Sequence, residues 1–268
     1  MFSVVLVSYN SAHVIGDAIR SIPEGNQAIV VDNASRDDSV AVARALGAEV
    51  VELPKNLGFG TACNRGAERA RFERLLFLNP DARLQPGALD ALGAAFERYP
   101  AAGAFNPRIL NQSGVQVFRR RTKLLPRPYL FRPPVPDRDA RLVFATGAAL
   151  AVRRNLFSSL GGFDEDIFLY FEDDDLSVRI QQAGWTLMYI NDAVCKHAAG
   201  TSTQPSRDTL AFKEYQFMRS KIMTYRKHRI LHMKNIELFI LLIKRCVAKN
   251  ATLNDKYDAH IKAFHDMN

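Results

Sequence analysis

The first eighty residues alternate short apolar runs with stretches of helical periodicity. Apolar and β-branched residues predominate at positions 3–8, 28–31, 50–53 and 74–78, which is typical of strands. Between them, apolar side chains recur at helical spacing, and the third such segment covers about residues 60–71. This alternation predicts an α/β fold in which a mainly parallel sheet carries helices on both faces.

Polar residues directly follow three of the predicted strands. They are Tyr9-Asn10, Asp32-Asn33 and Asn79-Pro80-Asp81. In open α/β sheets, ligands bind in the crevice outside the carboxyl ends of the strands, so we expect these segments to face one site. Asn, Asp and Pro also form ordinary turns after strands, and this alternative stays open for each segment taken alone.

The composition is that of a folded domain with a sizeable core, because 47% of the 268 residues are hydrophobic. The three cysteines, Cys63, Cys195 and Cys246, stand far apart, which argues against a disulfide framework or structural zinc site and favours the reducing cytoplasm. Residues 1–8 include no basic leader and form too short an apolar run for a signal peptide, so we interpret them as the first strand.

The net charge of +8 is concentrated in one segment. Residues 213–249 contain ten Lys and Arg against two acids, and the rest of the chain has 26 residues of each sign. Because the remainder is neutral, we expect no nucleic-acid partner. Residues 119–141 are also basic and contain five prolines, which predicts a long surface loop that is either solvated or attracts an anionic acceptor.

Seven short motifs occur in order along the chain. They are Val7-Ser8-Tyr9-Asn10, Val31-Asp32-Asn33-Ala34-Ser35, Asn56-Leu57-Gly58-Phe59-Gly60, Leu78-Asn79-Pro80-Asp81-Ala82, Gly162-Phe163-Asp164, Glu172-Asp173-Asp174-Asp175-Leu176 and His197-Ala198-Ala199-Gly200-Thr201-Ser202. Together they resemble glycosyltransferase family 2, and especially its bacterial rhamnosyltransferase-like members that build surface polysaccharides. The resemblance covers about residues 3–229.

The resemblance implies a Rossmann-like GT-A fold. Residues 1–205 would form the catalytic domain, with a nucleotide-sugar half at about 1–110 and an acceptor half at about 142–205. Residues 206–268 would form a helical extension. The implied reaction is an inverting transfer from a nucleoside-diphosphate sugar, with dTDP-L-rhamnose as the favoured donor and a UDP-hexose as the alternative.

The departing diphosphate develops negative charge that the enzyme must stabilise. By the resemblance, Asn79-Pro80-Asp81 is a variant of the Asp-x-Asp motif, in which Asp81 would coordinate Mg²⁺ or Mn²⁺ bridging the diphosphate. His197 would reach the metal or the diphosphate from the far side. A lone histidine is otherwise a structural or solvated residue.

The resemblance also implies a nucleotide pocket. Asp32 matches the acid that contacts the pyrimidine base or its ribose, and Tyr9, Asn10, Asn33 and Asn79 would help to line the pocket. An Asx-turn or a helix N-cap is the alternative for Asp32 and its neighbour.

Gly58 would let the backbone pass close to the nucleotide. The glycine spacing is not that of a dinucleotide-binding fingerprint, and the chain has no Gly-Lys-Ser/Thr phosphate loop.

Asp173 is the candidate catalytic base. An inverting displacement needs a group that takes the proton of the acceptor hydroxyl, and the resemblance assigns this role to the Asp after Glu172. Thr146, Gly147, Glu172 and Arg219 would lie on the acceptor side. The alternative is that acids in a first helical turn only complement the helix dipole.

The extension contains an apolar run at residues 236–243, which only Glu237 interrupts. It is too short to span a bilayer, which takes about 20 residues. It is expected either to pack on the catalytic domain or to lie at a membrane surface, near a saccharide acceptor linked to polyprenyl diphosphate. The rivals to an enzyme are a non-catalytic saccharide-binding protein and an anionic-surface binding module.

Overall fold

The structure of the protein is a computed structural model, and it describes residues 1–119, 122, 124, 134–201, 206–230, 234–248 and 250–267. Much of the predicted loop at 119–141, and Ser202 of the last motif, lie outside these residues.

The strands are β1 (Ser3–Ser8), β2 (Gln27–Asp32), β3 (Glu49–Glu52), β4 (Arg74–Leu78), β5 (Ala82–Leu84), β6 (Ala102–Leu110), β7 (Gln116–Val117), β8 (Ala140–Leu142), β9 (Ala149–Arg153) and β10 (Thr186–His197). The helices are α1 (Ala12–Arg20), α2 (Ser39–Ala45), α3 (Phe59–Ala67), α4 (Ala88–Arg98), α5 (Arg154–Ser159), α6 (Glu172–Gln182), α7 (Arg207–Lys227), α8 (Lys234–Val247) and α9 (Ala251–Asp266).

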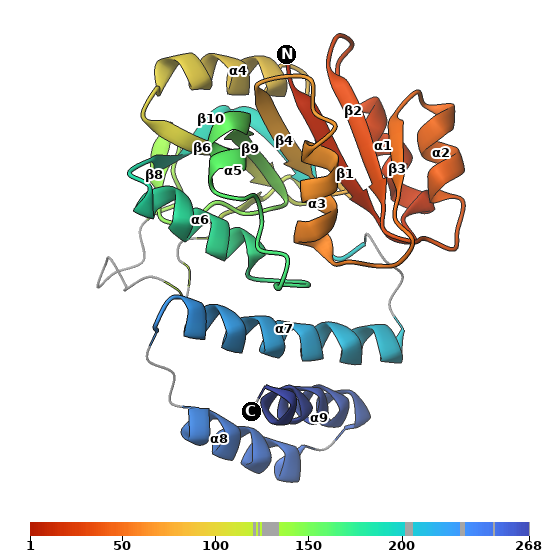
Figure 1. Ribbon diagram of the computed structural model, residues 1–268, viewed down its shortest axis with the longest axis vertical. Helices are drawn as coiled ribbons and strands as arrows, with labels where there is room; N and C mark the ends of the chain where they lie inside the picture. The colour runs from red at the N-terminus through yellow and green to blue at the C-terminus, as the bar shows by residue number, and fades with distance from the viewer. Residues whose placement is uncertain are drawn as a thin grey trace.

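One sheet organises the part of the chain that is predicted to be the catalytic domain (Figure 1). Its strand order is β3-β2-β1-β4-β9-β6-β10-β5, with β7 beside β6 and β8 beside β10. The four strands from β3 to β4 are parallel. β9 runs antiparallel to both of its neighbours, so the second half of the sheet is mixed. The predicted α/β fold is confirmed, and its purely parallel part is the N-terminal half.

Helices cover both faces of the sheet because each side carries its own apolar core. On one face, Ile15 of α1, Ala43 of α2 and Leu92 of α4 pack against the strands. On the other face, α3, α5 and α6 contribute a second cluster that includes Phe157 and Ile180. The middle residues of the buried strands β1, β2 and β4 are all apolar, as expected for a sheet covered on both sides.

Helix α3 ends earlier than the sequence predicts. It stops at Ala67 rather than near Arg71. The backbone N–H of Arg71 donates instead to the side chains of Ser3 and Gln27, at 3.1 and 2.9 Å. These contacts draw the chain toward the first strands and end the helix.

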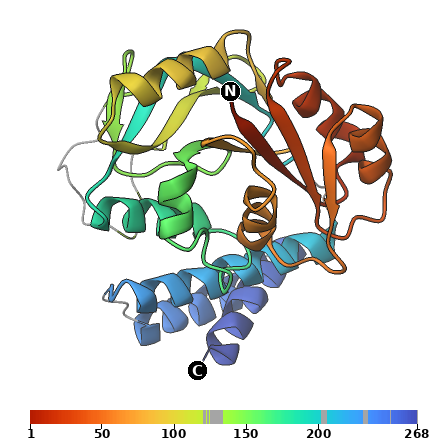
Figure 2. The ribbon, with the colours of Figure 1, turned by 45° about the horizontal axis from the view of Figure 1, so that its top comes forward.

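The C-terminal extension consists of α7, α8 and α9. α7 lies between the catalytic domain and the other two helices (Figures 1 and 2). Met218 and Ile222 of α7 pack with Leu241 of α8 and Phe264 of α9 in a small separate core. Within the part of the chain that the structure describes, no helix has the length and apolar character needed to cross a bilayer.

Candidate active site

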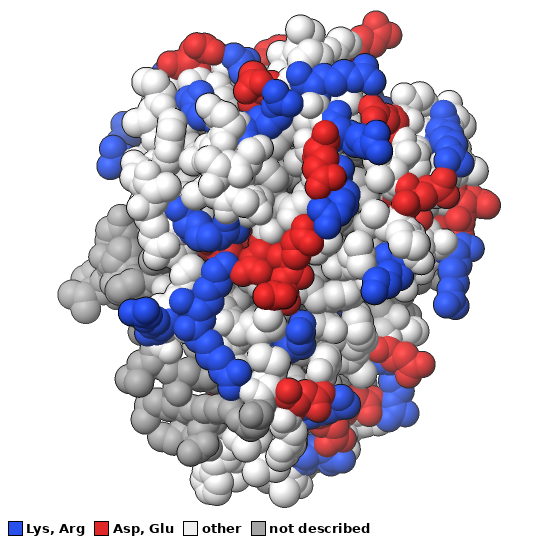
Figure 3. All heavy atoms as spheres, in the orientation of Figure 1, with Lys and Arg blue, Asp and Glu red and all other residues white. Residues whose placement is uncertain are grey.

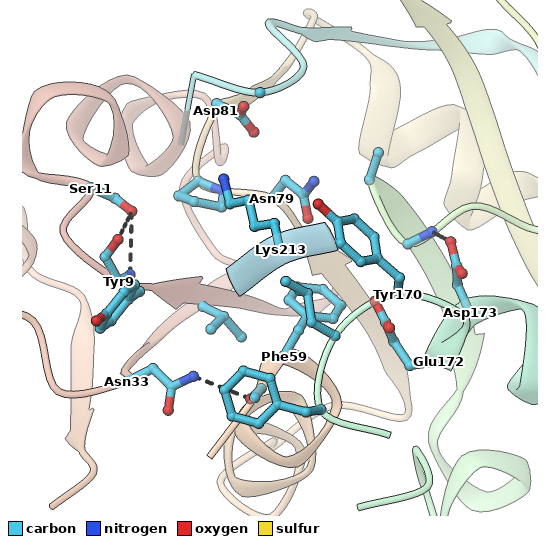
Figure 4. Close-up of a pocket in the computed structure, with 18 of the residues that line it drawn as sticks. Tyr9, Ser11, Asn33, Phe59, Asn79, Asp81, Tyr170, Glu172, Asp173 and Lys213 are labelled. Carbon is cyan, nitrogen blue, oxygen red and sulfur yellow. Dashed lines mark hydrogen bonds between the residues drawn. The ribbon is translucent and has the colours of Figure 1, made fainter. Parts of the chain in front are cut away.

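The carboxyl ends of β1, β2 and β4 meet at one cavity of about 400 Å³ (Figure 4). These strands are parallel neighbours, so the residues that follow them emerge on the same edge of the sheet. The cavity is lined by all the predicted site residues except Asn10, Asp32 and Arg219. Those lining it are Tyr9, Asn33, Gly58, Asn79, Asp81, Thr146, Gly147, Glu172, Asp173 and His197.

Asp81 and His197 form a pair at one side of the cavity. Nε2 of His197 lies 3.1 Å from Oδ1 of Asp81 and 3.2 Å from Nδ2 of Asn79. Oδ2 of Asp81 accepts a hydrogen bond from the backbone N–H of Thr201. Burial alone would raise the pKa of Asp81, but hydrogen bonding and charge from His197 outweigh it, so this pKa lies below its usual value. Asp81 is therefore an anion at neutral pH.

Asp173 lies on the other side of the cavity, with Asn79 and Tyr170 between it and Asp81 (Figure 4). Its Oδ2 accepts from the backbone N–H of Gly147 and its Oδ1 from that of Asp174, both at 2.9 Å. Burial raises the pKa of Asp173, and the hydrogen bond from Gly147 opposes the rise. The two N–H groups also fix the orientation of the carboxylate.

The acids beside Asp173 lie in a low-dielectric setting. Glu172 is buried, and its pKa is raised well above the usual value by burial and by the charge of Asp173. Burial and the same charge raise the pKa of Asp174 to about 6, although Arg119 contacts it at 3.2 Å. Neighbouring carboxylates that cannot all ionise together are typical of active sites.

Asp175 differs from the other acids in α6. It is paired with Arg179 at 2.8 Å, Lys227 at 2.8 Å and His228 at 2.7 Å. Burial would raise its pKa, but Arg179 and Lys227 lower it below the usual value. Its partners Lys227 and His228 belong to the end of α7, so Asp175 joins the extension to the catalytic domain.

Comparison with known proteins identifies the family. The profile described as Glycosyl transferase family 2 matches residues 3–161, more than half of the chain. The chain belongs to glycosyltransferase family 2. It is a glycosyltransferase.

Relatives and a solved structure agree with this assignment. The N-acetylglucosaminyl-diphospho-decaprenol L-rhamnosyltransferase of Mycobacterium tuberculosis is 34% identical in an alignment of 206 residues, which covers 65% of this chain and 67% of the relative. The O-antigen chain rhamnosyltransferase WbaN of Salmonella anatum is 24% identical over 65% of this chain and 56% of its own. A mannosyltransferase from Pyrobaculum calidifontis, solved with GDP-Man and Mn²⁺, matches with a TM-score of 0.61 at 19% identity, covering 98% of this chain and 69% of that one. The fold of the glycosyltransferase is thus GT-A.

Asp32 and Asn10, both predicted to bind the nucleotide, do not line the cavity. Oδ2 of Asp32 accepts from the backbone N–H of Ser35 at 2.9 Å, and Oδ1 is buried without a hydrogen-bond partner among the described residues. Asn10 binds the same loop, because its Oδ1 accepts from the N–H of Arg36. Asp32 therefore makes a local turn rather than a cap of α2, whose residue Ser39 is bound by Asp37.

Gly58 is needed for a reason that the sequence did not reveal. We expected its backbone to approach the nucleotide. Its φ is +89°, and a Cβ at this position would lie 2.3 Å from the carbonyl oxygen of Phe168. The close neighbour is thus the chain's own backbone. Asn33 holds the same loop, since its Oδ1 accepts from Leu57 and its Nδ2 donates to the carbonyl of Gly58.

Lys213 is a cavity residue that sequence reasoning missed. It extends from α7 toward Asn79 (Figure 4), and Thr209 and Phe212 from the same helix also line the cavity. No acid pairs with its ammonium group within the described part of the chain. The i, i+3, i+4 spacing of these three residues was the available signal, because it places them on one face of a helix.

Arg219, predicted on the acceptor side, lines neither this cavity nor the adjoining one behind Tyr170. Its side chain donates to the carbonyl of Asp166 at 3.4 Å. Six residues after Lys213, it lies on a different face of α7, because a helix turns about 100° per residue. Of these two residues of α7, Lys213 therefore lines the cavity and Arg219 does not, and the acceptor-side role of Arg219 stays a prediction.

Proposed function

We propose that this glycosyltransferase moves L-rhamnose from dTDP-rhamnose to a saccharide linked to polyprenyl diphosphate. The reaction inverts the anomeric centre, uses Mg²⁺ or Mn²⁺, and serves the synthesis of a surface polysaccharide at the cytoplasmic face of a membrane. Support for the sugar and the acceptor comes from the names of the mycobacterial and Salmonella relatives. A UDP-hexose donor is the alternative within the same family.

The observation that carries the proposal is the placement of Asp81 and Asp173 on two sides of one cavity. A donor whose diphosphate lies beside Asp81 presents its sugar toward Asp173. An acceptor hydroxyl beside Asp173 then attacks from the face opposite the leaving group. This arrangement suits a single displacement, which needs a base and no covalent nucleophile.

The side chains around the cavity account for the steps of the transfer. The acceptor oxygen forms a bond to the anomeric carbon while the bond from that carbon to the diphosphate oxygen breaks. The electron pair of the broken bond leaves with the nucleoside diphosphate, and Asp173 takes the hydroxyl proton. The N–H groups of Gly147 and Asp174 hold the Asp173 carboxylate in place. Lys213 supplies positive charge toward the departing diphosphate.

The residues at Asp81 fit a divalent ion that arrives with the nucleotide. No cluster of three or more acidic, His or Cys ligands occurs among the described residues, so the protein alone offers one carboxylate and one imidazole. Mg²⁺ is commonly bound by one or two carboxylates together with substrate phosphates, and Mn²⁺ also accepts oxygen ligands. A bound ion would neutralise charge on the diphosphate.

The nucleotide would enter along Tyr9 and Asn33, which line the cavity at the ends of β1 and β2. The unpartnered Oδ1 of Asp32 is buried behind the residues that line the cavity, so it would have to become exposed to accept from the ring N–H of a pyrimidine base, a hydrogen bond that thymine and uracil offer equally. Burying an acceptor atom without a partner costs free energy, which a bound base would recover.

Donor and metal dependence can be tested together. Purified protein is incubated with dTDP-rhamnose, UDP-glucose or UDP-N-acetylglucosamine, with Mn²⁺ or with excess EDTA. We expect release of the nucleotide only with metal, faster with dTDP-rhamnose and with an N-acetylglucosaminyl-diphospho-lipid acceptor. Nucleotide release from a UDP-hexose alone would select the alternative donor. A protein that binds saccharides and releases no nucleotide under any condition is a non-catalytic binding protein.

A further inference from the structure

The outer face of α8 exposes large apolar side chains. Phe239 is 63% exposed, and Ile240, Leu242 and Ile243 are 44%, 45% and 48% exposed. The opposite face of the helix is covered, since Leu241 is buried against α7 and α9. A contiguous apolar surface of this kind on a helix indicates a contact site.

The extension as a whole carries more positive than negative charge. Residues 206–268 contain thirteen Lys and Arg against six acids. Five of these acids are matched within the extension, in the pairs Glu214–Lys256, Glu237–Lys221, Asp255–Arg207, Asp258–Arg245 and Asp266–Lys262. Surplus cations remain. Among them, Lys244 on α8 and Arg229 in the segment before it are exposed and have no acidic partner among the described contacts.

We infer that the outer face of α8 docks on an anionic membrane surface, with its apolar side chains among the lipid headgroups and its surplus cations on anionic lipid. A helix that cannot span a bilayer and pairs an apolar face with basic residues binds in the interface plane. The inference deepens the proposed function, since it names the surface on which a lipid-linked acceptor would be met.

A second copy of the chain would bind this face of α8 less favourably than an anionic membrane. A two-fold symmetric contact brings identical surfaces together. It would therefore bring together two chains that each carry a net charge of +8, and like charges repel each other. An anionic surface complements the same charges.

Docking through α8 leaves the catalytic cavity uncovered. α7 separates α8 from the catalytic domain (Figures 1 and 2), and no residue described as lining the cavity belongs to α8. At the lower end of the molecule in Figure 3, where Figure 1 places α8 and α9, uncharged surface lies beside a group of acidic and basic side chains.

Vesicle co-sedimentation tests the inference. We expect the full chain to bind phosphatidylcholine vesicles that contain phosphatidylglycerol, and to release them as salt is raised, because screening shortens the reach of the charges. Phe239→Ser combined with Ile243→Ser should weaken binding at least about tenfold, since affinity scales with buried apolar area. Val115→Ser, which removes an exposed apolar side chain of the catalytic domain, is the matched control and should not change binding.

A fluorescent variant gives a second measurement. Trp185, the only tryptophan, lies in the catalytic domain. Phe239→Trp should therefore add an emission that shifts to the blue with anionic vesicles and stays unchanged with phosphatidylcholine alone. Lys244→Gln should weaken binding a few-fold, and only to anionic vesicles.

Three results separate this inference from the proposed function. Failure of the folded protein to bind anionic vesicles at low salt overturns the inference, even if sugar transfer is observed. A concentration-dependent dimer that Phe239→Ser abolishes assigns the face to a second copy and overturns it as well. Vesicle binding without release of nucleotide from any donor keeps the inference and refutes only the proposed function.

Discussion

Helix α6 of the catalytic domain and helices α8 and α9 of the extension differ in which side chains they bury and which they expose. α6 buries Glu172 and Asp174 beside Asp173, where burial raises all three pKa values. In α9, Asp255, Asp258 and Asp266 each face a basic partner at the surface. The apolar residues reverse this pattern, since those of the sheet are buried and those on the outer face of α8 are exposed.

The contrast indicates which surface of each region has a function. Burying a carboxylate without a full set of partners costs free energy, so such groups persist where chemistry needs them. Asp175 shows the opposite case within α6, because it is as buried as Glu172 and Asp174 and is paired with three basic side chains. The catalytic domain therefore has its buried acids with raised pKa values at the cavity. The extension has its exposed apolar side chains on its outer surface.

Asp173→Asn should have the largest effect. It removes the base and keeps the shape, so turnover should fall by about 10² to 10⁴ while thermal stability and donor binding stay nearly unchanged. Initial rates and nucleotide titration calorimetry would measure this. Retention of more than about a tenth of the rate would contradict the role of Asp173. Asp175→Asn is the matched control and should reduce the free energy of unfolding instead, because it leaves buried cationic partners uncompensated.

Asp81→Ala should weaken binding of the nucleoside diphosphate on the order of 10²-fold, because the metal and its charge stabilisation are lost. Binding of the bare nucleoside should change little, since Tyr9 and Asn33 lie on another side of the cavity. Calorimetry with both ligands and Mn²⁺ makes the comparison. Equal losses for the two ligands, or full activity in excess EDTA, would refute the metal assignment.

Lys213→Met tests whether the two regions are independent, because this residue belongs to the extension and enters the cavity. Loss of a charged hydrogen-bond donor should lower kcat about ten- to a hundredfold. Lys262→Met removes an exposed lysine of α9 and should have no effect on kcat. A Lys213→Met enzyme with the kcat of the unsubstituted protein would confine the chemistry to residues before α7.

Asp174→Asn should have the smallest effect, on stability. The pKa of Asp174 in the folded protein is about 6, above the ordinary 3.8. Between these two pH values the folded state therefore keeps a proton on Asp174 that the unfolded state has lost. The contribution of this proton to the stability of the folded state is fully present below about pH 4 and is lost as the pH rises through 6. The variant should gain about 1–3 kcal/mol in the free energy of unfolding at pH 7.5 and little at pH 4. Urea unfolding at both pH values decides, and a loss of stability at pH 7.5 would contradict the raised pKa.

The sequence predicts the N-terminal half of the fold well because the strands there are short and largely apolar, and three of the four are followed by polar residues at one edge. The same reasoning placed Asn33, Asn79 and Asp81 at one site. The role proposed for Asp173 rests on the family resemblance, since periodicity alone cannot distinguish a base from an acid that complements a helix dipole.

The failures are contacts between segments that are distant in the sequence. Lys213 enters the cavity only because α7 packs across its edge, and Gly58 is constrained by Phe168, which lies more than a hundred residues later. The early end of α3 depends on Ser3 and Gln27. No local pattern records such tertiary contacts, and one-dimensional reasoning therefore misses them.

Helix α7 sets where this protein can be recombined with its relatives. One side of it lines the cavity through Lys213, and Met218 and Ile222 support α8 and α9. A chimera that exchanges the whole extension at residue 206 would replace a wall of the active site together with the outer helices. A crossover after Arg229, before α8, keeps the donor cavity of one parent and takes the outer surface of the other. Engineered hybrids that change where the enzyme acts without changing what it transfers should therefore be joined at that point.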